Sequence, residues 1–537
     1  MLTIAISQIN LKVGDFNYNI SRILEHYQHA STAKHPVDLV IYPEMTVCGY
    51  PPEDLVLLDA FANQAMDSIK QLALKTKNGP AMLVGGIYYN PETGKRYNSA
   101  FLLQDGVISA RHDKYHRPNY GVFDEKRYFT GGNTPNIIPF KGHKLGILIC
   151  EDCWQPTTTD LLIRHGAELM ISLNASPFEY NKQDERKTIA KHIPVPFIYT
   201  NIVGGQDELV FDGHSFASNA HGDVIMQMPQ FKEDFGIVSF DDHQLTCTTH
   251  QPDTTHCLEE TIYQAICLGL KDYVSKNHFN GVVIGMSGGI DSALTAAIAV
   301  DSLGPEKVRL IMMPSPYTSN ESLTDAKNCA DYLGVTLESV NIIPMMESFN
   351  KELATLFSGT DVDTTEENMQ SRIRGTILMA ISNKFNLMVI TTGNKSEMAT
   401  GYATLYGDMC GGYNALKDVY KTQVFDLAKW RNTQNKVIPE NIISKPPTAE
   451  LKDNQKDEDS LPNYNDLDKI LKMILEEKKS SQDIINASDF DPQTVKKIAH
   501  LIKISEYKRR QAPPGVKISR LAFGRDRRLP LVSGYNL

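Results

Sequence analysis

Several features of secreted and membrane proteins are missing from this 537-residue sequence. Its eight cysteines are too few in so long a chain for a disulfide framework. The segment Met1–Ser7 has neither the basic start nor the long apolar core of a signal peptide. The chain also contains no apolar run long enough to span a membrane. We therefore expect a protein of the reducing cytoplasm that has no membrane partner.

An excess of positive charge is missing as well. The 54 lysine and arginine residues are outnumbered by 64 aspartate and glutamate residues, which gives a formal net charge of −10. Proteins that bind nucleic acids generally rely on positive charge to contact the phosphates, so we expect no nucleic-acid partner. The composition, with 41% hydrophobic and 22% charged residues, is typical of a globular protein. The length exceeds that of one ordinary core and indicates two or more domains.

A change of pattern near residues 242–258 divides the chain. Short β-like runs with intervening helices dominate up to about Phe240, and residues 242–258 are polar and without periodicity. We therefore predict a first domain at 1–241, a linker at 242–258 and a second domain at 259–537. The second domain alternates strands and helices, which predicts a parallel sheet covered by helices. Its expected elements are 282–286, 291–303, 308–313, 321–333, 336–342, 366–384 and 387–392, and the polar stretch 451–459 is expected to be a mobile loop or insertion.

A glycine-rich loop is the most informative motif of the second domain. Residues Gly285–Ser292 read Gly-Met-Ser-Gly-Gly-Ile-Asp-Ser, between the apolar run Val282–Ile284 and a helical segment that begins at Ala293. Free N–H groups and the helix dipole make such a strand–loop–helix a cradle for an anion. It lacks the Gly-Lys-Ser/Thr of a Walker loop, and the alternative is a chance glycine turn before a helix. The Ser-Gly-Gly-x-Asp-Ser form resembles the pyrophosphate-binding loop of the ATP pyrophosphatases, which release AMP and pyrophosphate when they adenylate a substrate.

Three reactive side chains follow predicted strands of the first domain. Glu44 ends the run 39–44, Lys114 follows a predicted hairpin at 99–110, and Cys150 ends the run 145–150. A cysteine nucleophile needs a base or a positive neighbour; Glu44 could take its proton, and Lys114 could stabilise the thiolate and an oxyanion. Taken singly, each residue has an ordinary alternative, because glutamate and lysine are usually solvated and a cysteine that ends a strand is usually core.

The order and local context of these three residues resemble the Glu-Lys-Cys triad of the nitrilase superfamily of carbon–nitrogen hydrolases, over roughly residues 1–240. Cys150 also forms a Cys-x-x-Cys pair with Cys153, but acidic residues lie between the thiols and disfavour redox chemistry. A zinc site would need a second nearby pair, and the next cysteine, Cys247, is remote in sequence. We therefore interpret Cys150 as the nucleophile and Cys153 as a packing residue.

An amide-cleaving cysteine releases ammonia, and an adenylating site prepares a carboxylate to react with it. This pairing resembles the glutamine-dependent NAD+ synthetases across nearly the whole chain. The fold that this implies is α/β: a nitrilase-like αββα sandwich followed by a parallel-sheet α/β ATP-pyrophosphatase domain. The second-domain motifs that carry the resemblance are Glu367–Arg374, Thr392–Glu397, Tyr406–Asp408, Lys417–Lys421 and Tyr507–Gly515, of which the last could by itself be a solvated basic tail.

The resemblance implies roles for residues of the first domain. Cys150 would attack the side-chain amide of glutamine, Lys114 and the backbone N–H of Glu151 would hold the oxyanion, and Glu44 would move the proton and later activate water. The residues expected to bind the rest of glutamine are Tyr120, Ser176 and Lys182. Lys182 replaces an arginine found in some relatives, which exchanges a planar fork for a point charge.

In the second domain the resemblance implies ATP and Mg2+ as substrate and cofactor, and deamido-NAD+ as the molecule that is amidated. The residues expected to bind ATP are Gly285, Met286, Ser287, Gly288, Gly289, Ile290, Asp291, Ser292, Thr392 and Lys421. Asp291 and Glu397 are the expected Mg2+ ligands. The residues expected to contact deamido-NAD+ are Asn368, Arg372, Glu397 and Lys508. A loop that orders on binding is expected within 401–418, and by analogy the chain is expected to form a homo-oligomer, a dimer or higher.

Three alternatives have different sequence signatures. Other glutamine amidotransferases use a Cys-His-Glu triad or an N-terminal cysteine, whereas this chain begins Met1-Leu2. An ATP pyrophosphatase that acts on tRNA would normally add a basic RNA-binding region, against which the acidic balance weighs. A first domain that only binds a partner, beside a synthetase that uses free ammonia, would have no need of Glu44, Lys114 and Cys150 together.

Overall fold

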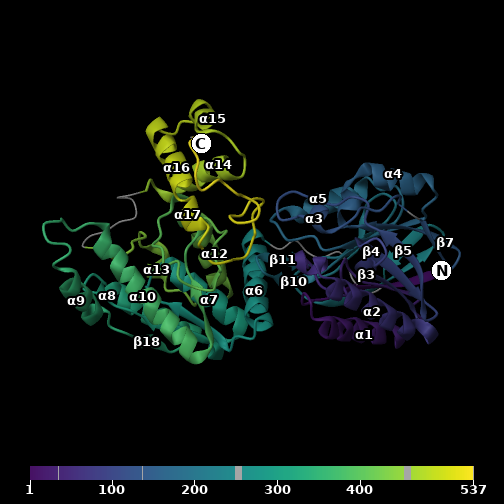
Figure 1. Cartoon of the computed structure of the whole chain (residues 1–537), viewed down its shortest axis with the longest axis horizontal. Helices are drawn as coiled ribbons and strands as arrows, with labels where there is room; N and C mark the ends of the chain where they lie inside the picture. The colour runs from purple at the N-terminus through teal and green to yellow at the C-terminus, as the bar shows by residue number, and fades with distance from the viewer. Residues whose placement is uncertain (34–35, 136, 248–256, 453–460, 536–537) are drawn as a thin grey trace. The chain divides into compact units, whose positions relative to one another are not determined.

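The computed structural model describes residues 1–33, 36–135, 137–247, 257–452 and 461–535 (Figure 1). The chain divides into two compact units, Met1–Thr255 and His256–Leu537, each with its own sheets and core. Within the described residues, no helix combines the length and the apolar character needed to cross a membrane.

Two β-sheets form the centre of the first unit. One has seven strands in the order β15-β14-β1-β2-β3-β4-β5 and the other six in the order β13-β12-β9-β8-β7-β6. The strands are β1 Leu2–Gln8, β2 Leu39–Ile41, β3 Ala81–Asn90, β4 Lys95–Gln104, β5 Val107–Asp113, β6 Ile137–Phe140, β7 His143–Ile149, β8 Leu169–Asn174, β9 Phe197–Asn201, β10 Val203–Gln206, β11 Leu209–Asp212, β12 Phe216–Ser218, β13 Val224–Gln227, β14 Asp234–Asp241 and β15 Gln244–Cys247. The helices are α1 Phe16–Ser31, η1 Glu53–Leu57, α2 Asp59–Lys75, η2 Thr76–Asn78, α3 Glu125–Tyr128, η3 Cys150–Trp154, α4 Pro156–Arg164 and α5 Lys182–Lys191.

The alternation of side chains along these strands builds a four-layered sandwich. Ile4 of β1 and Ile147 of β7 belong to one apolar cluster, so the two sheets pack face to face. The next residue along each strand points the opposite way because a strand has a period of two. Ala5 accordingly joins the cluster that contains α1 and α2, and Leu148 joins the one that contains α4 and α5. The predicted αββα arrangement is confirmed.

The structure differs from the sequence-based prediction at the end of the first unit. Part of the predicted linker 242–258 is the edge strand β15, which pairs antiparallel with β14. Only Leu245 of this strand is buried, so the short run carries too little apolar pattern to be recognised as a strand. Helix α6 begins at Leu258, and residues 248–256 lie outside the described part of the chain.

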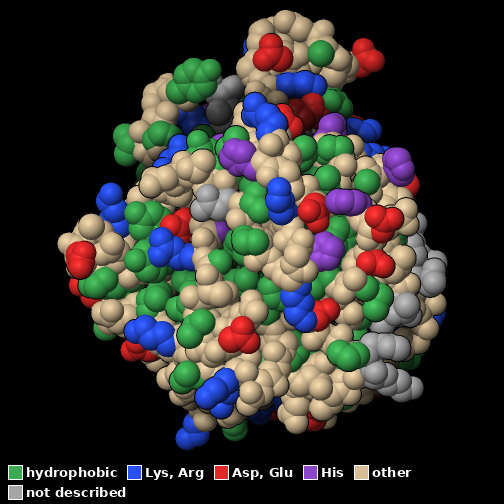
Figure 2. Space-filling view, turned by 90° about the vertical axis from the view of Figure 1, so that its right-hand side faces the viewer, with side chains coloured by type: hydrophobic (Ala, Val, Ile, Leu, Met, Phe, Trp, Pro, Cys, Tyr) green, Lys and Arg blue, Asp and Glu red, His purple; other side chains and the backbone are tan. Residues whose placement is uncertain are grey.

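Charges of both signs are mixed over the face of the molecule in Figure 2. Lysine and arginine side chains (blue) alternate with acidic ones (red) among the described residues, and several histidines lie between them. Opposite charges therefore offset one another over this face.

A five-stranded parallel sheet organises the second unit, in the order β18-β17-β16-β19-β20. The strands are β16 Gly281–Gly285, β17 Val308–Met312, β18 Leu337–Ser339, β19 Leu387–Thr391 and β20 Tyr413–Asn414. The helices are α6 Leu258–Lys276, α7 Ile290–Leu303, η4 Pro305–Lys307, α8 Asn320–Leu333, α9 Ile343–Leu353, α10 Thr364–Phe385, α11 Lys395–Thr400, α12 Lys421–Gln434, α13 Glu440–Ser444, α14 Tyr464–Leu475, α15 Ser481–Ala487, α16 Pro492–Ile504 and α17 Glu506–Arg509. Each element predicted for this unit is present, although β18 is shorter than predicted.

The order of the strands determines where a ligand can bind. Strand β16 is the first of this sheet in the chain, and its neighbours β17 and β19 follow it on opposite sides. In an open parallel sheet, a crevice forms outside the carboxyl ends of the strands where the order reverses in this way. The loop after β16, Gly285–Ser292, therefore lies at the place where such sheets bind ligands.

Helices cover this sheet, and a second apolar cluster lies among the later helices. Ile373 and Leu378 of α10 pack with Val283 of β16 and Val389 of β19. A separate cluster joins α14, α15 and α16. The predicted loop at 451–459 falls mostly within 453–460, which lies outside the described residues.

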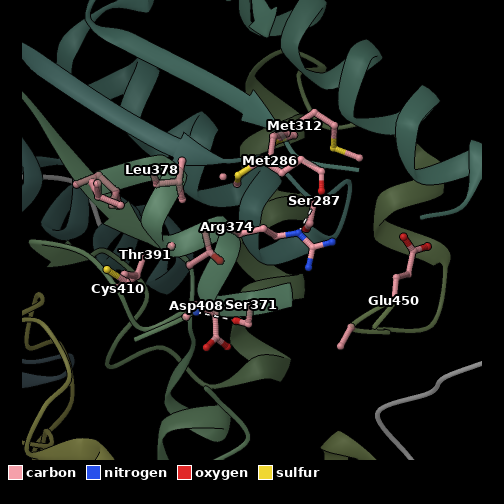
Figure 3. Close-up of a pocket in the computed structure, with 18 of the residues that line it drawn as sticks. Met286, Ser287, Met312, Ser371, Arg374, Leu378, Thr391, Asp408, Cys410 and Glu450 are labelled. Atoms are coloured by element: carbon pink, nitrogen blue, oxygen red, sulfur yellow. Dashed lines mark hydrogen bonds between the residues drawn. The ribbon is translucent and has the colours of Figure 1, made fainter. Parts of the chain in front are cut away.

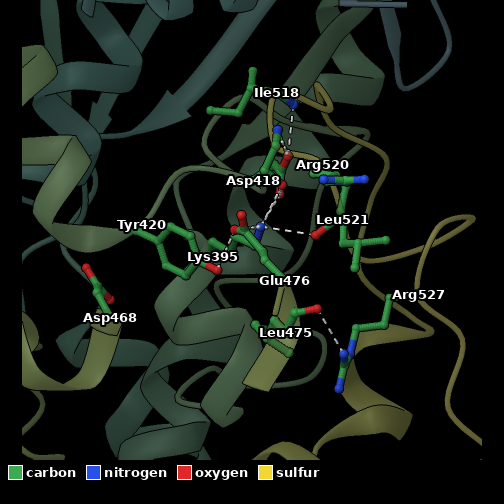
Figure 4. Close-up of polar contacts among 12 residues, drawn as sticks. Lys395, Asp418, Tyr420, Asp468, Leu475, Glu476, Ile518, Arg520, Leu521 and Arg527 are labelled. Carbon is green, nitrogen blue, oxygen red and sulfur yellow. Dashed lines mark hydrogen bonds and ion pairs between the residues drawn. The ribbon is translucent and has the colours of Figure 1, made fainter. Parts of the chain in front are cut away.

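A buried lysine ties the C-terminal segment to this unit (Figure 4). Lys395 Nζ lies 2.8 Å from Asp418 Oδ1 and 3.3 Å from Glu476 Oε1, and it donates to Ser519 Oγ at 2.7 Å. Asp418 Oδ2 in turn accepts the backbone N–H groups of Ile518 and Ser519 at 2.8 and 2.7 Å. Segments far apart in sequence therefore share one network of buried charges.

Replacing Lys395 should destabilise the second unit. Lys395→Met leaves two carboxylates without their buried cation, and we expect the free energy of unfolding to fall by about 3–5 kcal/mol in urea titrations. Lys327→Met, which breaks an exposed pair with Asp331, is the matched control and should cost less than about 1 kcal/mol. Equal losses for the two variants would contradict this account of the network.

Candidate active sites

The three reactive residues of the first unit meet in its interior. Glu44 follows β2, Lys114 follows β5 and Cys150 follows β7, and their side chains are 1%, 1% and 5% exposed. Lys114 Nζ donates to Glu44 Oε1 at 2.8 Å, and the charges of both residues act on the thiol of Cys150. The structure therefore brings together the triad that the sequence predicts.

The backbone around Cys150 is held in an unusual conformation. Its φ of +44° lies in the left-handed region that side chains other than glycine rarely occupy. Asp152 anchors the turn, because its carboxylate accepts the N–H of Ile149 at 3.2 Å and that of His116 at 2.7 Å. One carboxylate therefore fixes the segment after β7, which carries Cys150, and the segment after β5, which carries Lys114.

The electrostatics of the site keep the thiol protonated and the lysine charged. Burial raises the pKa of Cys150 well above its ordinary value, and the Glu44 carboxylate adds to this rise while Lys114 opposes it. Burial acts to lower the pKa of Lys114, but the carboxylates of Glu125 and Glu44 outweigh it and the pKa is raised. A neutral thiol needs a base before it can act as a nucleophile. The Glu44 carboxylate is held beside it, because it accepts from Asn98 Nδ2 at 2.6 Å and from the N–H of Ala175 at 2.9 Å.

Glu125 is a fourth member of this cluster that the sequence analysis missed. Its Oε1 accepts from Lys114 Nζ at 2.8 Å and from the Tyr50 hydroxyl at 3.0 Å. Burial raises the pKa of its carboxyl to about 7, with Lys114 acting in the opposite direction. Glu125 lies on the four-residue helix α3, which has no apolar periodicity, so no local signal marks it.

The predicted glutamine-binding residues lie in different surroundings. Tyr120 is exposed and its hydroxyl donates to Glu151 Oε2 at 2.8 Å. Ser176 is buried and its Oγ accepts from Arg186 Nη2 at 3.1 Å. Lys182 contacts Glu185 at 3.3 Å and lies over the ring of Trp154 at 4.6 Å.

Tyr120 and Ser176 lie close to the triad, whereas Lys182 approaches it through Trp154, the last residue of η3. A thiolate at Cys150 would raise the pKa of Tyr120 and that of Arg186, which borders Ser176. Lys182, the first residue of α5, instead contacts Glu185 of the same helix and the ring of Trp154. Arg186 was missed by the sequence analysis, because in sequence it is one of several charged residues of a polar helix, although it is fully buried and pairs with Asp212 at 2.8 Å.

The glycine loop of the second unit is tightly packed. Gly288 has a φ of +79°, and a Cβ placed on it would lie 2.4 Å from the backbone oxygen of Ser322 at the start of α8. Hydrogen bonds within the loop also hold its shape. The hydroxyls of Ser287 and Ser292 lie 3.0 Å apart, and Ser292 Oγ donates to Gly289 O at 3.0 Å. Only glycine fits at position 288.

Two adjoining hollows, of about 180 and 250 Å3, lie beside this loop. They share seven lining residues: Ser287, Ser371, Arg374, Thr392, Asp408, Ala449 and Glu450. The residues that give the smaller hollow an apolar lining include Met286, Met312, Leu378 and Cys410 (Figure 3). The polar lining of the larger hollow includes Asp291, Glu397 and Lys421. An apolar end next to a polar end suits a molecule with a flat ring and charged groups.

Two carboxylates converge in the polar hollow. Lys421 Nζ pairs with Asp291 Oδ2 and lies 3.6 Å from Glu397 Oε1, and Asp291 Oδ1 accepts from Asn394 Nδ2 at 3.0 Å. Both carboxylates therefore face one positively charged atom, an arrangement that also fits a divalent cation. In the part of the chain that the structure describes, no three His, Cys, Asp or Glu side chains group to hold a metal. A Mg2+ ion here would therefore need phosphate oxygens to complete its coordination.

The other predicted dinucleotide contacts gather at the segment 401–405. Thr404 Oγ1 donates to Asn368 Oδ1 at 2.8 Å, and Arg372 Nε donates to Leu405 O at 3.2 Å. Lys508 Nζ donates to the backbone oxygens of Gly401 and Ala403 at 2.7 and 2.6 Å. In this structure these three side chains hold the start of the predicted binding loop, whereas Glu397 lines the polar hollow.

Comparison with known proteins finds a different family for each of the two units. The carbon-nitrogen hydrolase family model matches residues 3–247, and the NAD synthase family model matches residues 262–512. A carbon-nitrogen hydrolase domain followed in one chain by an NAD synthase domain defines a ligase of the amidotransferase class.

The similarity extends over both units. A protein of Acinetobacter baylyi named glutamine-dependent NAD(+) synthetase is 46% identical over 99% of this chain and 98% of its own, and one of Xanthomonas campestris with the same name is 43% identical over 100% and 98%. The structure of a glutamine-dependent NAD+ synthetase from Acinetobacter baumannii in complex with ADP is 41% identical, with a TM-score of 0.80 and 99% of each chain covered. A structure from Cytophaga hutchinsonii shares the fold at 21% identity, with a TM-score of 0.82 over 99% of this chain and 98% of that one. The chain belongs to the glutamine-dependent NAD+ synthetase family.

Glu125 should matter for amide cleavage although it lies behind Lys114. Glu125→Gln removes one of the two carboxylates that hold Lys114. We expect glutamine hydrolysis to fall by about 10²-fold, because Lys114, the predicted partner of the oxyanion, is displaced. Glutamate release by the purified protein measures this. The exposed Glu25→Gln variant should hydrolyse glutamine like the wild type, and an unchanged rate for Glu125→Gln would remove Glu125 from the site.

Adding a methyl group at Gly288 should disrupt nucleotide binding. Gly288→Ala combines an unfavourable φ with a clash against Ser322 O, so the loop must shift, and we expect ATP affinity measured by calorimetry to fall at least about tenfold. Gly334→Ala is the control, because Gly334 has a φ of +70° but open space around its Cβ. That variant should lose about 1–2 kcal/mol of stability and bind ATP normally. Equal ATP affinities for the two variants would contradict the packing argument.

Proposed function

We propose that this chain converts deamido-NAD+ to NAD+ with ATP and with ammonia taken from glutamine, and that glutamate, AMP and pyrophosphate are the other products. The observation that carries the proposal is the buried pair of Lys114 and Glu44 beside Cys150. It would supply an amide-cleaving site to a chain that also contains two adjoining hollows, one with apolar and one with polar lining, beside the glycine loop.

In the first unit, Glu44 takes the proton of Cys150 as the thiol attacks the side-chain amide of glutamine. Lys114 and the backbone N–H of Glu151 stabilise the oxyanion, and Glu44 passes the proton to the departing ammonia. Glu44 then activates the water that hydrolyses the thioester. Tyr120, Ser176 and Lys182 bind the α-amino and α-carboxylate groups; the buried pair of Arg186 with Asp212 supports the position of Ser176.

In the second unit, the loop Gly285–Ser292, Thr392 and Lys421 bind ATP, with the adenine in the apolar hollow and the pyrophosphate end beside the loop. Asn368, Arg372, Glu397 and Lys508 bind deamido-NAD+. Asp291 and Glu397 would hold Mg2+, which would neutralise phosphate charge there. Adenylation of the nicotinate carboxylate lets ammonia displace AMP.

The domain boundaries and the assembly belong to the same proposal. We assign glutamine cleavage to residues 1–241 and synthesis to residues 259–537, with β15 as an extension of the first sheet. The protein acts as a homo-oligomer whose ligands are small molecules.

The test is product formation by the full chain with ATP, Mg2+ and deamido-NAD+, with glutamine or ammonium supplied in parallel. We expect NAD+ and AMP from both nitrogen sources. Cys150→Ala should abolish NAD+ formation from glutamine and retain it from ammonium, whereas Asp291→Ala should lose it with either source. These opposite patterns follow because Cys150 only supplies nitrogen, while Asp291 serves the site at which every product forms.

Three outcomes would overturn parts of the proposal. Glutamine-dependent synthesis by Cys150→Ala at the wild-type rate would remove the nucleophile, and full activity of Asp291→Ala with ammonium would remove the metal assignment. Absence of NAD+ from either nitrogen source with the wild type would mean that another carboxylate is adenylated.

A further inference from the structure

Arg374 lies where the two hollows of the second unit join. It projects from α10 and lines both the apolar and the polar hollow. Figure 3 shows its guanidinium between Ser287 of the glycine loop and Glu450 on the opposite wall. It is the one cation that borders both hollows within the described residues.

A backbone contact fixes the direction of this side chain. Arg374 Nε donates to Met313 O at 3.1 Å, just after the carboxyl end of β17. With Nε held by the wall, the two terminal nitrogens of the planar fork are left for a ligand. The fork is therefore oriented before any ligand enters.

The other cations of the polar hollow already have carboxylate partners. Lys421 pairs with Asp291, and Lys445 Nζ lies 3.1 Å from Asp325 Oδ2. Arg374 makes no ion pair among the described residues, and burial lowers its pKa to about 10, with the Glu450 carboxylate acting in the opposite direction. Glu450 is itself bound by the hydroxyls of Ser319 and Ser322 at 2.8 Å each. Arg374 is thus a partly buried positive charge that lacks a close counter-charge.

We propose that Arg374 is a catalytic residue that binds the α-phosphate of ATP and stabilises the charge that develops there during adenylation. The proposal rests on the function proposed above, because that function places adenine in one hollow and the pyrophosphate end beside the glycine loop. The phosphate that connects these two parts of ATP is the α-phosphate, and it must cross the junction that Arg374 lines. A planar guanidinium matches the non-bridging oxygens of a phosphate.

The step is balanced without a further reactant. A carboxylate oxygen of the nicotinate attacks the α-phosphorus and forms a new O–P bond, while the bond from the α-phosphorus to the bridging oxygen breaks and its electron pair leaves with pyrophosphate. Arg374 donates hydrogen bonds to the non-bridging oxygens as negative charge builds on them, and it keeps its protons throughout. No oxidation or reduction is involved.

Pyrophosphate exchange isolates this step. The full-length enzyme is given ATP, Mg2+, deamido-NAD+ and labelled pyrophosphate without any nitrogen source, and the label that enters ATP is measured together with KM for ATP. We expect Arg374→Met to lower the maximal exchange rate by roughly 10²–10³-fold, with a smaller change in KM. Arg374→Lys should fall between Arg374→Met and the wild type, because it keeps the charge but loses the fork. Glutamine hydrolysis in the first unit should be unchanged in both variants.

Two controls separate catalysis from a role in packing α10 against β17. Guanidinium chloride at a concentration that leaves the wild type unaffected should restore part of the exchange activity of Arg374→Ala, and sodium chloride should not. Arg309→Lys is the matched control, because it is the same substitution on β17, where Arg309 pairs with Glu338 away from the two hollows. Its rate of pyrophosphate exchange should equal that of the wild type. If Arg374→Met does not fold, the test uses Arg374→Lys, provided that this variant melts at the wild-type temperature. A reduced maximal exchange rate in that folded variant would support the proposal, and a wild-type rate would contradict it.

Two results would overturn the proposal. One is a wild-type maximal exchange rate in both Arg374→Lys and Arg374→Met. The other is a loss of exchange activity that parallels a fall in melting temperature and is not restored by guanidinium. Failure of the underlying function would look different. In that case the wild type itself would make no NAD+ and would show no exchange that depends on deamido-NAD+.

Discussion

The carboxyl ends of parallel strands impose the constraint on which both sites depend. In the first unit, Glu44 follows β2, which runs parallel to β1 and β3, and Cys150 follows β7, which runs parallel to β8 in the facing sheet. In the second unit, the glycine loop follows the central strand of a parallel sheet, at the point where the strand order reverses. Side chains from distant parts of the sequence can therefore be held in fixed positions, because the sheet beneath them is rigid.

Each site also keeps a lysine out of water between two carboxylates. Lys114 contacts Glu44 and Glu125, and Lys421 lies between Asp291 and Glu397. An unpaired charge buried in this way would be very unfavourable, so the carboxylates make the buried lysine possible. The same pairing raises the pKa of Lys114, whereas burial, with a further contribution from Glu44, raises the pKa of the neighbouring Cys150 thiol.

The sequence predicts well those helices, strands and loops whose form depends on residues that are adjacent in the chain. The run of strand, glycine loop and helix at 282–303 and the strand that ends at Cys150 carry their own patterns, and both lie where they were predicted. Glu125 and Arg186 could not be identified in the same way, because their importance comes from contacts with Lys114 and Asp212, which lie elsewhere in the chain. The edge strand β15 was missed for a related reason: its pairing with β14, and not its composition, makes it a strand.

The contacts of the C-terminal segment have a consequence for how the protein is made. The buried pair of Lys395 and Asp418 depends on Ile518 and Ser519 for its hydrogen bonds, so its partners are incomplete until that segment has left the ribosome. The first unit, in contrast, closes its main sheet when β14 pairs with β1, long before synthesis reaches that segment. During translation the first unit can thus be finished while the charged interior of the second unit still awaits its last residues.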